Sequence, residues 1–141
     1  DRAGEHVAAG SADGTVTIMG VYTKAHTVHT FAQSIRSVAL DPLHGRRPAC
    51  PFLAGGAVDG VRRCSRGRIT KRPKVEELQT GGGTLHDIQW RGGLVAWADD
   101  RGATVYDARK ATIVTQVSRP PCPTIHPSLL TWALCWASDT D

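Results

Sequence analysis

The stretch that decides the fold reads Leu94-Val95-Ala96-Trp97-Ala98-Asp99-Asp100-Arg101-Gly102-Ala103-Thr104-Val105-Tyr106-Asp107. Two apolar runs are separated by an acidic segment that ends in glycine. Glycine adopts the positive φ angles of a tight hairpin turn without steric cost, and valine and tyrosine favour strands. The stretch therefore predicts two antiparallel strands, near residues 94–98 and 103–107, joined by a short turn.

The same layout occurs twice earlier in the chain, at residues 6–18 and 52–60. Its turn glycines are Gly14, Gly60 and Gly102, which lie 46 and 42 residues apart. A second series of apolar segments alternates with the first, at residues 35–42, 85–90 and 129–132. Repeats of about 40–45 residues with four strands each are typical of β-propeller blades.

The sequence therefore predicts an all-β fold, a partial β-propeller of WD-type four-stranded blades with about three blades, incomplete at both ends. We expect a partial first blade in 1–34, a second blade in 35–84 with a basic loop at 62–74, a third blade in 85–118, and a linker and the start of a fourth blade in 119–141. The strands are expected near 6–10, 15–21, 27–31, 35–40, 52–56, 61–64, 75–79, 85–90, 94–98, 103–107, 112–117 and 129–136. A propeller protects its strand edges by closing into a ring of at least four blades, so we expect the chain to be part of a longer protein.

Composition narrows the functional class. The chain has 141 residues, 40% of them hydrophobic, and a formal net charge of +4. Its sequence has no apolar run of 18 residues, no secretory signal and no closely spaced cysteine framework, which favours a cytosolic setting. The charge is too small to predict nucleic-acid binding by itself, and no nucleic-acid partner is expected.

Several strings resemble the amino-terminal propeller of the vacuolar protein sorting-associated protein 41 family. They are residues 11–18 with 20–23, residues 37–42, Gly55-Gly56, and above all His86-Asp87-Ile88-Gln89-Trp90-Arg91 followed by residues 94–98 and 105–107. The resemblance implies a subunit of the HOPS tethering complex, with a propeller followed by a long helical solenoid. It also implies work with Rab-type GTPases and an adaptor complex, in traffic to the vacuole or lysosome through late endosomes.

The strand expected near residues 61–64 departs from the family. It reads Val61-Arg62-Arg63-Cys64 where the family is apolar, and either register directs an arginine toward the core. A buried charge without a partner is costly, which suggests a distorted blade.

A basic stretch is the strongest candidate for a binding patch. It consists of Arg62, Arg63, Arg66, Arg68, Lys71, Arg72 and Lys74. One interpretation is a surface for anionic lipid, an acidic partner or RNA. The other, which we favour, is a solvated loop between strands, because no aromatic residues interleave with the charges as stacking on bases requires.

Other motifs carry weaker signals. His26 and His29 lack the further ligands of a zinc site, and Gly81-Gly82-Gly83 lacks the lysine of a phosphate-binding loop. No catalytic motif accompanies Asp87 or the Asp99-Asp100 pair. We therefore expect no catalytic residues, no metal and no cofactor.

The turn residues are expected to be structural: Asp13, Gly14, Asp59, Gly60, Gly102 and Asp107. The leading hypothesis is a non-catalytic protein-interaction scaffold of a tethering-complex subunit, located in the cytoplasm and peripherally on the late endosome or vacuole through its partners. The alternative is a generic WD-repeat adaptor in RNA processing or ubiquitin ligation. A hydrolase with catalytic residues in the central channel is a third hypothesis.

Overall fold

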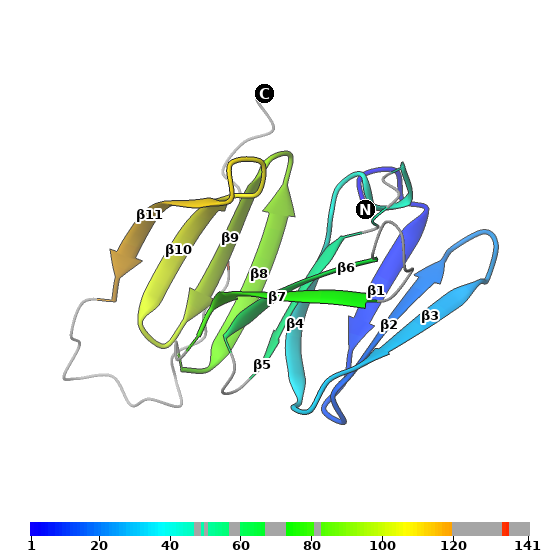
Figure 1. Ribbon diagram of the computed structural model, residues 1–141, viewed down its shortest axis with the longest axis horizontal. Helices are drawn as coiled ribbons and strands as arrows, with labels where there is room; N and C mark the ends of the chain where they lie inside the picture. The colour runs from blue at the N-terminus through cyan, green and yellow to red at the C-terminus, as the bar shows by residue number, and fades with distance from the viewer. Residues whose placement is uncertain are drawn as a thin grey trace.

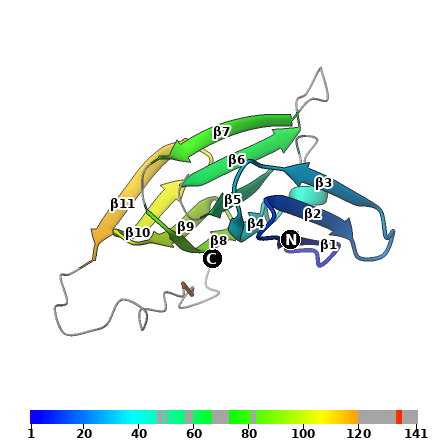
Figure 2. The ribbon, with the colours of Figure 1, turned by 90° about the horizontal axis from the view of Figure 1, so that it is seen from below.

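The computed structural model describes residues 1–46, 49, 51–56, 60–66, 73–80, 83–119 and 134–135. Within these ranges the chain forms three antiparallel sheets that stand side by side (Figures 1 and 2). The first sheet, or first blade, contains β1 (His6–Gly10), β2 (Thr15–Gly20) and β3 (His26–Thr30). The second blade contains β4 (Ile35–Leu40), β5 (Phe52–Gly56), β6 (Val61–Arg66) and β7 (Pro73–Gln79). The third contains β8 (Leu85–Arg91), β9 (Leu94–Asp99), β10 (Gly102–Asp107) and β11 (Thr112–Ser118).

Each blade is a meander in which neighbours in sequence pair in space. The inner strand β4 lies beside β8 of the next blade and beside β1 of the previous one. This arrangement confirms the predicted partial β-propeller. The eleven strands begin and end within two residues of the predicted positions. The fourth inner strand expected at 129–136 lies outside the described residues, except for residues 134–135, which are not in a strand.

The structure differs from the expectation of one basic loop at 62–74. Residues 62–66 belong to β6 and residues 73–74 begin β7. The two strands pair in register from Arg62 opposite Glu77 to Arg66 opposite Pro73, so the blade is regular along this stretch. Among the described residues, helical structure is confined to the single 3₁₀ turn η1 (His44–Arg46). No helix in those ranges is long and apolar enough to cross a bilayer.

Two apolar layers hold the blades together, one in each space between neighbouring sheets. The layer between the first and second blades contains Val16, Ile18, Ile35, Phe52, Ala54 and Cys64. The layer between the second and third contains Leu53, Val61, Leu85, Ile88, Val95, Trp97 and Tyr106. The strand β5 is buried along its whole length because it contributes to both layers. Its residues Ala54 and Gly55 are small, which lets the neighbouring sheets approach it from both sides.

Candidate protein-interaction surface

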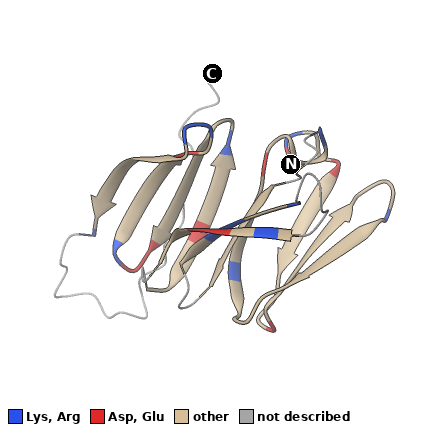
Figure 3. Cartoon of the chain, in the orientation of Figure 1, with Lys and Arg blue, Asp and Glu red and all other residues tan. Residues whose placement is uncertain are grey.

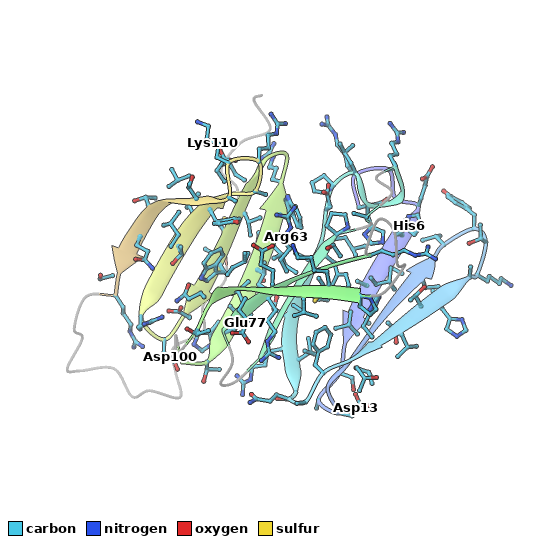
Figure 4. All side chains as sticks on the ribbon, viewed as in Figure 1. His6, Asp13, Arg63, Glu77, Asp100 and Lys110 are labelled. Atoms are coloured by element: carbon cyan, nitrogen blue, oxygen red, sulfur yellow. The ribbon has the colours of Figure 1, made fainter. Side chains whose placement is uncertain are left out.

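The turn acids are occupied by hydrogen bonds within their own turns. The carboxylate of Asp13 accepts hydrogen bonds from the backbone N–H of Thr15 at 2.9 Å and from its hydroxyl at 2.7 Å. Asp107 accepts from the backbone N–H groups of Arg109 at 2.8 Å and Lys110 at 3.0 Å. These bonds favour the charged form and hold the pKa of both carboxyl groups below the ordinary value. Both acids therefore shape turns, and Figure 4 shows Asp13 at the tip of the β1–β2 turn.

The turn glycines lie at equivalent places in the three blades. Gly14, Gly60 and Gly102 all have positive φ angles, of 87°, 71° and 147°. A Cβ atom at each position would lie 2.0–2.5 Å from a carbonyl oxygen at the end of the outer strand of the same blade. Glycine is thus required both by the backbone conformation and by the space. The neighbouring Asp59 lies outside the described residues.

Gln79 links the second and third blades through hydrogen bonds. Its side-chain Nε2 donates to Oδ2 of Asp99 at 2.9 Å, and its Oε1 accepts from the indole N–H of Trp97 at 2.6 Å. Trp97 is fully buried and Asp99 is 5% exposed. Oδ1 of Asp99 also accepts from the backbone N–H groups of Arg101 and Gly102. The outer strand of one blade is therefore tied to the turn of the next.

The inner strands β4 and β8 are joined by a second polar link. The hydroxyl oxygen of Ser37 accepts from the backbone N–H of Ile88 at 3.0 Å, and the hydroxyl donates to Asp87 at 3.5 Å. The other carboxylate oxygen of Asp87 accepts from the backbone N–H of Leu134 at 3.1 Å. Asp87 thus holds chain segments together.

The basic stretch does not form one patch in the described part of the structure. Arg62 and Arg66 face the first blade, whereas Arg63 lies on the opposite face of the same strand, toward the third blade. Nε of Arg62 lies 3.4 Å from Oε1 of Glu77. Arg63 lies near the hydroxyl of Tyr106 in the third blade, where it opposes the rise that burial causes in the pKa of that hydroxyl, and its position beside β7 can be followed in Figure 4.

Arg62 and Arg63, the two half-buried arginines of β6, each lie beside a polar group of another strand, whereas Arg66 is exposed. The pairing of β6 with β7 shifts register once, between Val61 and Arg62. Lys74 is exposed on β7, opposite Ser65. Arg68, Lys71 and Arg72 lie outside the described residues.

A groove with a volume of about 480 Å³ lies between the first and second blades. Ile18 and Phe52 close its floor, with exposures of 6% and 1%. The ring of His29 packs against Phe52, with their centroids 4.8 Å apart. The described residues that line the groove are His6, Ile18, Gly20, Thr23, Ala25, Thr27, Val28, His29, His44, Phe52, Ser65, Arg66 and Pro73.

Three histidines stand along this groove, and two of them are shifted toward the neutral form. Burial lowers the pKa of His29, and the nearby His44 lowers it further. Burial also lowers the pKa of His44, although its hydrogen bond to the carbonyl of Pro51 opposes the shift. Since a carbonyl only accepts, Nδ1 of His44 carries the proton of this 3.1 Å bond. The ring of His6 packs edge-on against His44 at 5.3 Å.

The one described group with metal-ligand atoms close together is Asp1, Glu5 and His6, whose atoms lie within 4.8 Å of one another. Oδ1 of Asp1 already accepts from the backbone N–H groups of Glu5 and His6. A cluster whose carboxylate is engaged in this way does not by itself define a metal site.

Comparison with known proteins places the chain in a family. The family model Beta-prop_Vps41, described as "Vps42 beta-propeller", matches residues 1–141. The chain belongs to the Vps41 β-propeller family. It is 31% identical over 141 residues to the vacuolar protein sorting-associated protein 41 homolog of Arabidopsis thaliana and 33% identical over 141 residues to that of Solanum lycopersicum.

The human member of the Vps41 family is 30% identical over 136 residues. These alignments cover 99% of the chain for the two plant proteins and 96% for the human protein, but the chain spans only 14–16% of the length of these relatives. The resemblance identified in the sequence is therefore confirmed for the propeller.

Sequence reasoning on this Vps41-type propeller did not locate the groove or the blade-to-blade links. Gln79 meets Trp97 and Asp99 across 18 and 20 residues of sequence, and Ser37 meets Asp87 across 50. No local pattern marks such contacts. The one available signal was the position of Gln79 at the end of an outer strand, next to the turn of the following blade.

Proposed function

We propose that this chain is a non-catalytic protein-interaction platform, part of a tethering-complex subunit. The complex would act in vesicle fusion and in protein sorting to the vacuole or lysosome through late endosomes. The observation that carries the proposal is the Vps41 family match along residues 1–141, together with relatives named vacuolar protein sorting-associated protein 41. Since the chain is a small part of those relatives, the role belongs to the whole protein.

The expected partners are the other protein subunits of a HOPS-type complex, a Rab-type GTPase and an adaptor complex. The protein would be cytoplasmic and would join the late endosome or vacuole membrane peripherally, through these partners. A propeller suits this work because its blades form a rigid support on which loops and grooves present side chains to other proteins.

The arrangement of the described acids supports a role without catalysis. The pair most like a catalytic dyad is His86 and Asp100, with Nε2 and Oδ1 2.7 Å apart. Here the carboxylate lies between the histidine and Thr84, whose backbone N–H donates to Oδ2 at 2.7 Å. A catalytic histidine must itself contact a nucleophile, with the carboxylate behind it, but the second group bound by this carboxylate is a backbone N–H, which is not a nucleophile. Burial raises the pKa of Asp100, but the bonds from Thr84 and His86 outweigh it and the net shift is downward.

Affinity purification of the full-length protein tests the proposal. The intact protein should co-purify with tethering-complex subunits, and deletion of the propeller should remove at least one partner while the remaining protein stays folded. Recovery of no sorting-complex subunit with the intact protein would reject the assignment of function. Recovery of the same partners after deletion would show that the propeller is not the platform.

A further inference from the structure

The groove between the first and second blades has the features of a binding site for a peptide. Strands on both sides of it are described: β2 and β3 on one side and β5, β6 and β7 on the other (Figure 2). Its volume of about 480 Å³ falls within the usual range of ligand-binding pockets. We propose that this groove binds an extended acidic–apolar segment of a partner protein. The inference rests on the proposed role as an interaction platform and names the chemistry of one partner.

The charge of the groove selects an acidic ligand. Among its described lining residues are one arginine, Arg66, and no aspartate or glutamate, whereas His29 and His44 are shifted toward the neutral form and add little charge. Arg66 is exposed at the rim, at the end of β6 and on the face of the sheet that looks toward the first blade. Lys24 is exposed in the turn between the lining residues Thr23 and Ala25. Figure 3 shows basic residues at both of these chain segments. A guanidinium at such a rim binds carboxylates through charge-assisted hydrogen bonds.

The walls select apolar side chains as well. Val28 is 52% exposed, and Ala25 and Pro73 are also exposed on the two sides of the groove. Apolar side chains of a ligand would contact these residues and cover the floor formed by Ile18 and Phe52. The floor is enclosed between two sheets, so a single extended chain can enter the groove, whereas a flat bilayer surface reaches only its rim. The geometry thus favours a peptide over a membrane.

Fluorescence anisotropy on the full-length protein provides the test. The probe is a labelled short peptide of alternating glutamate and leucine, and the comparison peptide carries lysine in place of glutamate. Arg66→Glu reverses the charge of the exposed rim, and Thr27→Glu adds a negative charge on the opposite wall. We expect each change to raise the Kd of the glutamate peptide at least about tenfold, because like charges across an interface oppose binding. The lysine peptide should bind wild type more weakly than the glutamate peptide does.

The matched control is Arg101→Glu, which reverses an exposed arginine in the β9–β10 turn of the third blade. Arg101→Glu changes the net charge by the same amount as Arg66→Glu. It should leave the Kd of the glutamate peptide within about twofold of the wild-type value, because exposed charges separated by more than about 10 Å are screened. Thermal unfolding confirms that each variant is folded. Equal losses with Arg66→Glu and Arg101→Glu would overturn the inference, as would equal binding of both peptides. Binding only to phosphatidylserine vesicles, and not to the peptide, would also overturn it.

The co-purification experiment separates this inference from the proposed function. If tethering subunits co-purify with the intact protein while the glutamate peptide does not bind, the groove inference fails and the proposed function stands. If the peptide binds in an Arg66-dependent manner while no tethering subunit is recovered, the proposed function fails and the groove inference stands.

Discussion

Gln79 is a single residue whose side chain satisfies two buried groups of a neighbouring blade. The indole N–H of Trp97 and a carboxylate oxygen of Asp99 both depend on it. Removing one partner of a buried polar group leaves the desolvation cost of that group uncompensated. Polar residues at the seams between blades therefore matter more for stability than their small number suggests.

Gln79→Ala should lower the free energy of unfolding of the propeller by about 1–3 kcal/mol. Chemical denaturation of the full-length protein, followed by a signal specific to the propeller, measures the change. Gln116→Ala is the matched control, since Gln116 is exposed on β11 and its described bond is to Thr104 in the same blade, at 3.3 Å. Gln79→Ala should lower the free energy of unfolding clearly more than Gln116→Ala does. A loss for Gln79→Ala no larger than that for Gln116→Ala would contradict the role given to this bridge.

Gly102→Ala should destabilise the third blade by roughly 2 kcal/mol or more, because it combines an unfavourable backbone conformation with a steric clash. The added Cβ would lie 2.0 Å from the carbonyl oxygen of Val117. Gly92 is the control: its φ is also positive, at 56°, but a Cβ there meets nothing within 4 Å. Gly92→Asn should therefore destabilise the blade clearly less than Gly102→Ala does, since asparagine tolerates this conformation. Differential scanning calorimetry compares the two, and equal shifts in Tm would refute the steric argument.

At the scale of the strand, β11 and β7 illustrate two ways of ending a blade. The edge strand β7 carries Lys74, Glu76 and Glu77 and begins with Pro73. The edge strand β11 is fully exposed and has no charged residue and no proline. Its apolar side chains Ile113, Val114 and Val117 are 51–64% exposed. Since uncharged edge strands pair readily with strands of other chains, β11 is more prone than β7 to such association.

Val114→Lys should reduce self-association of the full-length protein at high concentration, because a lysine on an edge strand opposes pairing with another chain. Val75→Lys on β7 is the matched control, since Val75 is 51% exposed on a strand that is already charged. Sedimentation velocity over a concentration series measures both variants. A similar change in the two variants would mean that β11 is not the associating edge.

Strand positions were predictable because each blade repeats local signals. The valine–threonine alternation of β2 marks a strand with one buried face, and Gly14 and Gly102 mark the turns at the start of β2 and β10. The outcome for β6 was less predictable, because its arginines looked incompatible with a core. Their partners, Glu77 and Tyr106, come from another strand and another blade, so no pattern local to β6 could reveal them. The groove was hidden for the same reason, since its two walls come from different blades.

At the scale of the whole molecule, the interface between the first two blades contains titratable groups as well as apolar ones. His29 and His44 both have pKa values below the ordinary value of 6.5, mainly because burial disfavours their charged form. The groups that act on His44 are His6 and the N-terminal amine, which lower its pKa, and Asp41, which raises it. We therefore expect the contact between these blades to be sensitive to pH.

The contribution of this interface to the free energy of unfolding should be largest above about pH 6.5. It should decline as the pH falls toward the lowered pKa values of His29 and His44. In that window the unfolded chain takes up protons that the folded chain does not bind, so protonation favours unfolding. Urea denaturation from pH 7.5 to 5 measures the effect, and His29→Gln with His44→Gln should flatten the profile. An unchanged slope in the double variant would show that these histidines do not cause it.

Because of its hydrogen bond to Gln79, the fluorescence of Trp97 can report on the contact between the second and third blades. The indole is fully buried in the third blade, yet its N–H is bound by the second. Any parting of these two blades exposes the ring to water and breaks that bond, which shifts indole emission to longer wavelength. A variant of the protein that keeps Trp97 as its sole tryptophan would therefore report, through its emission wavelength, whether binding of a partner separates the second and third blades or leaves them in contact.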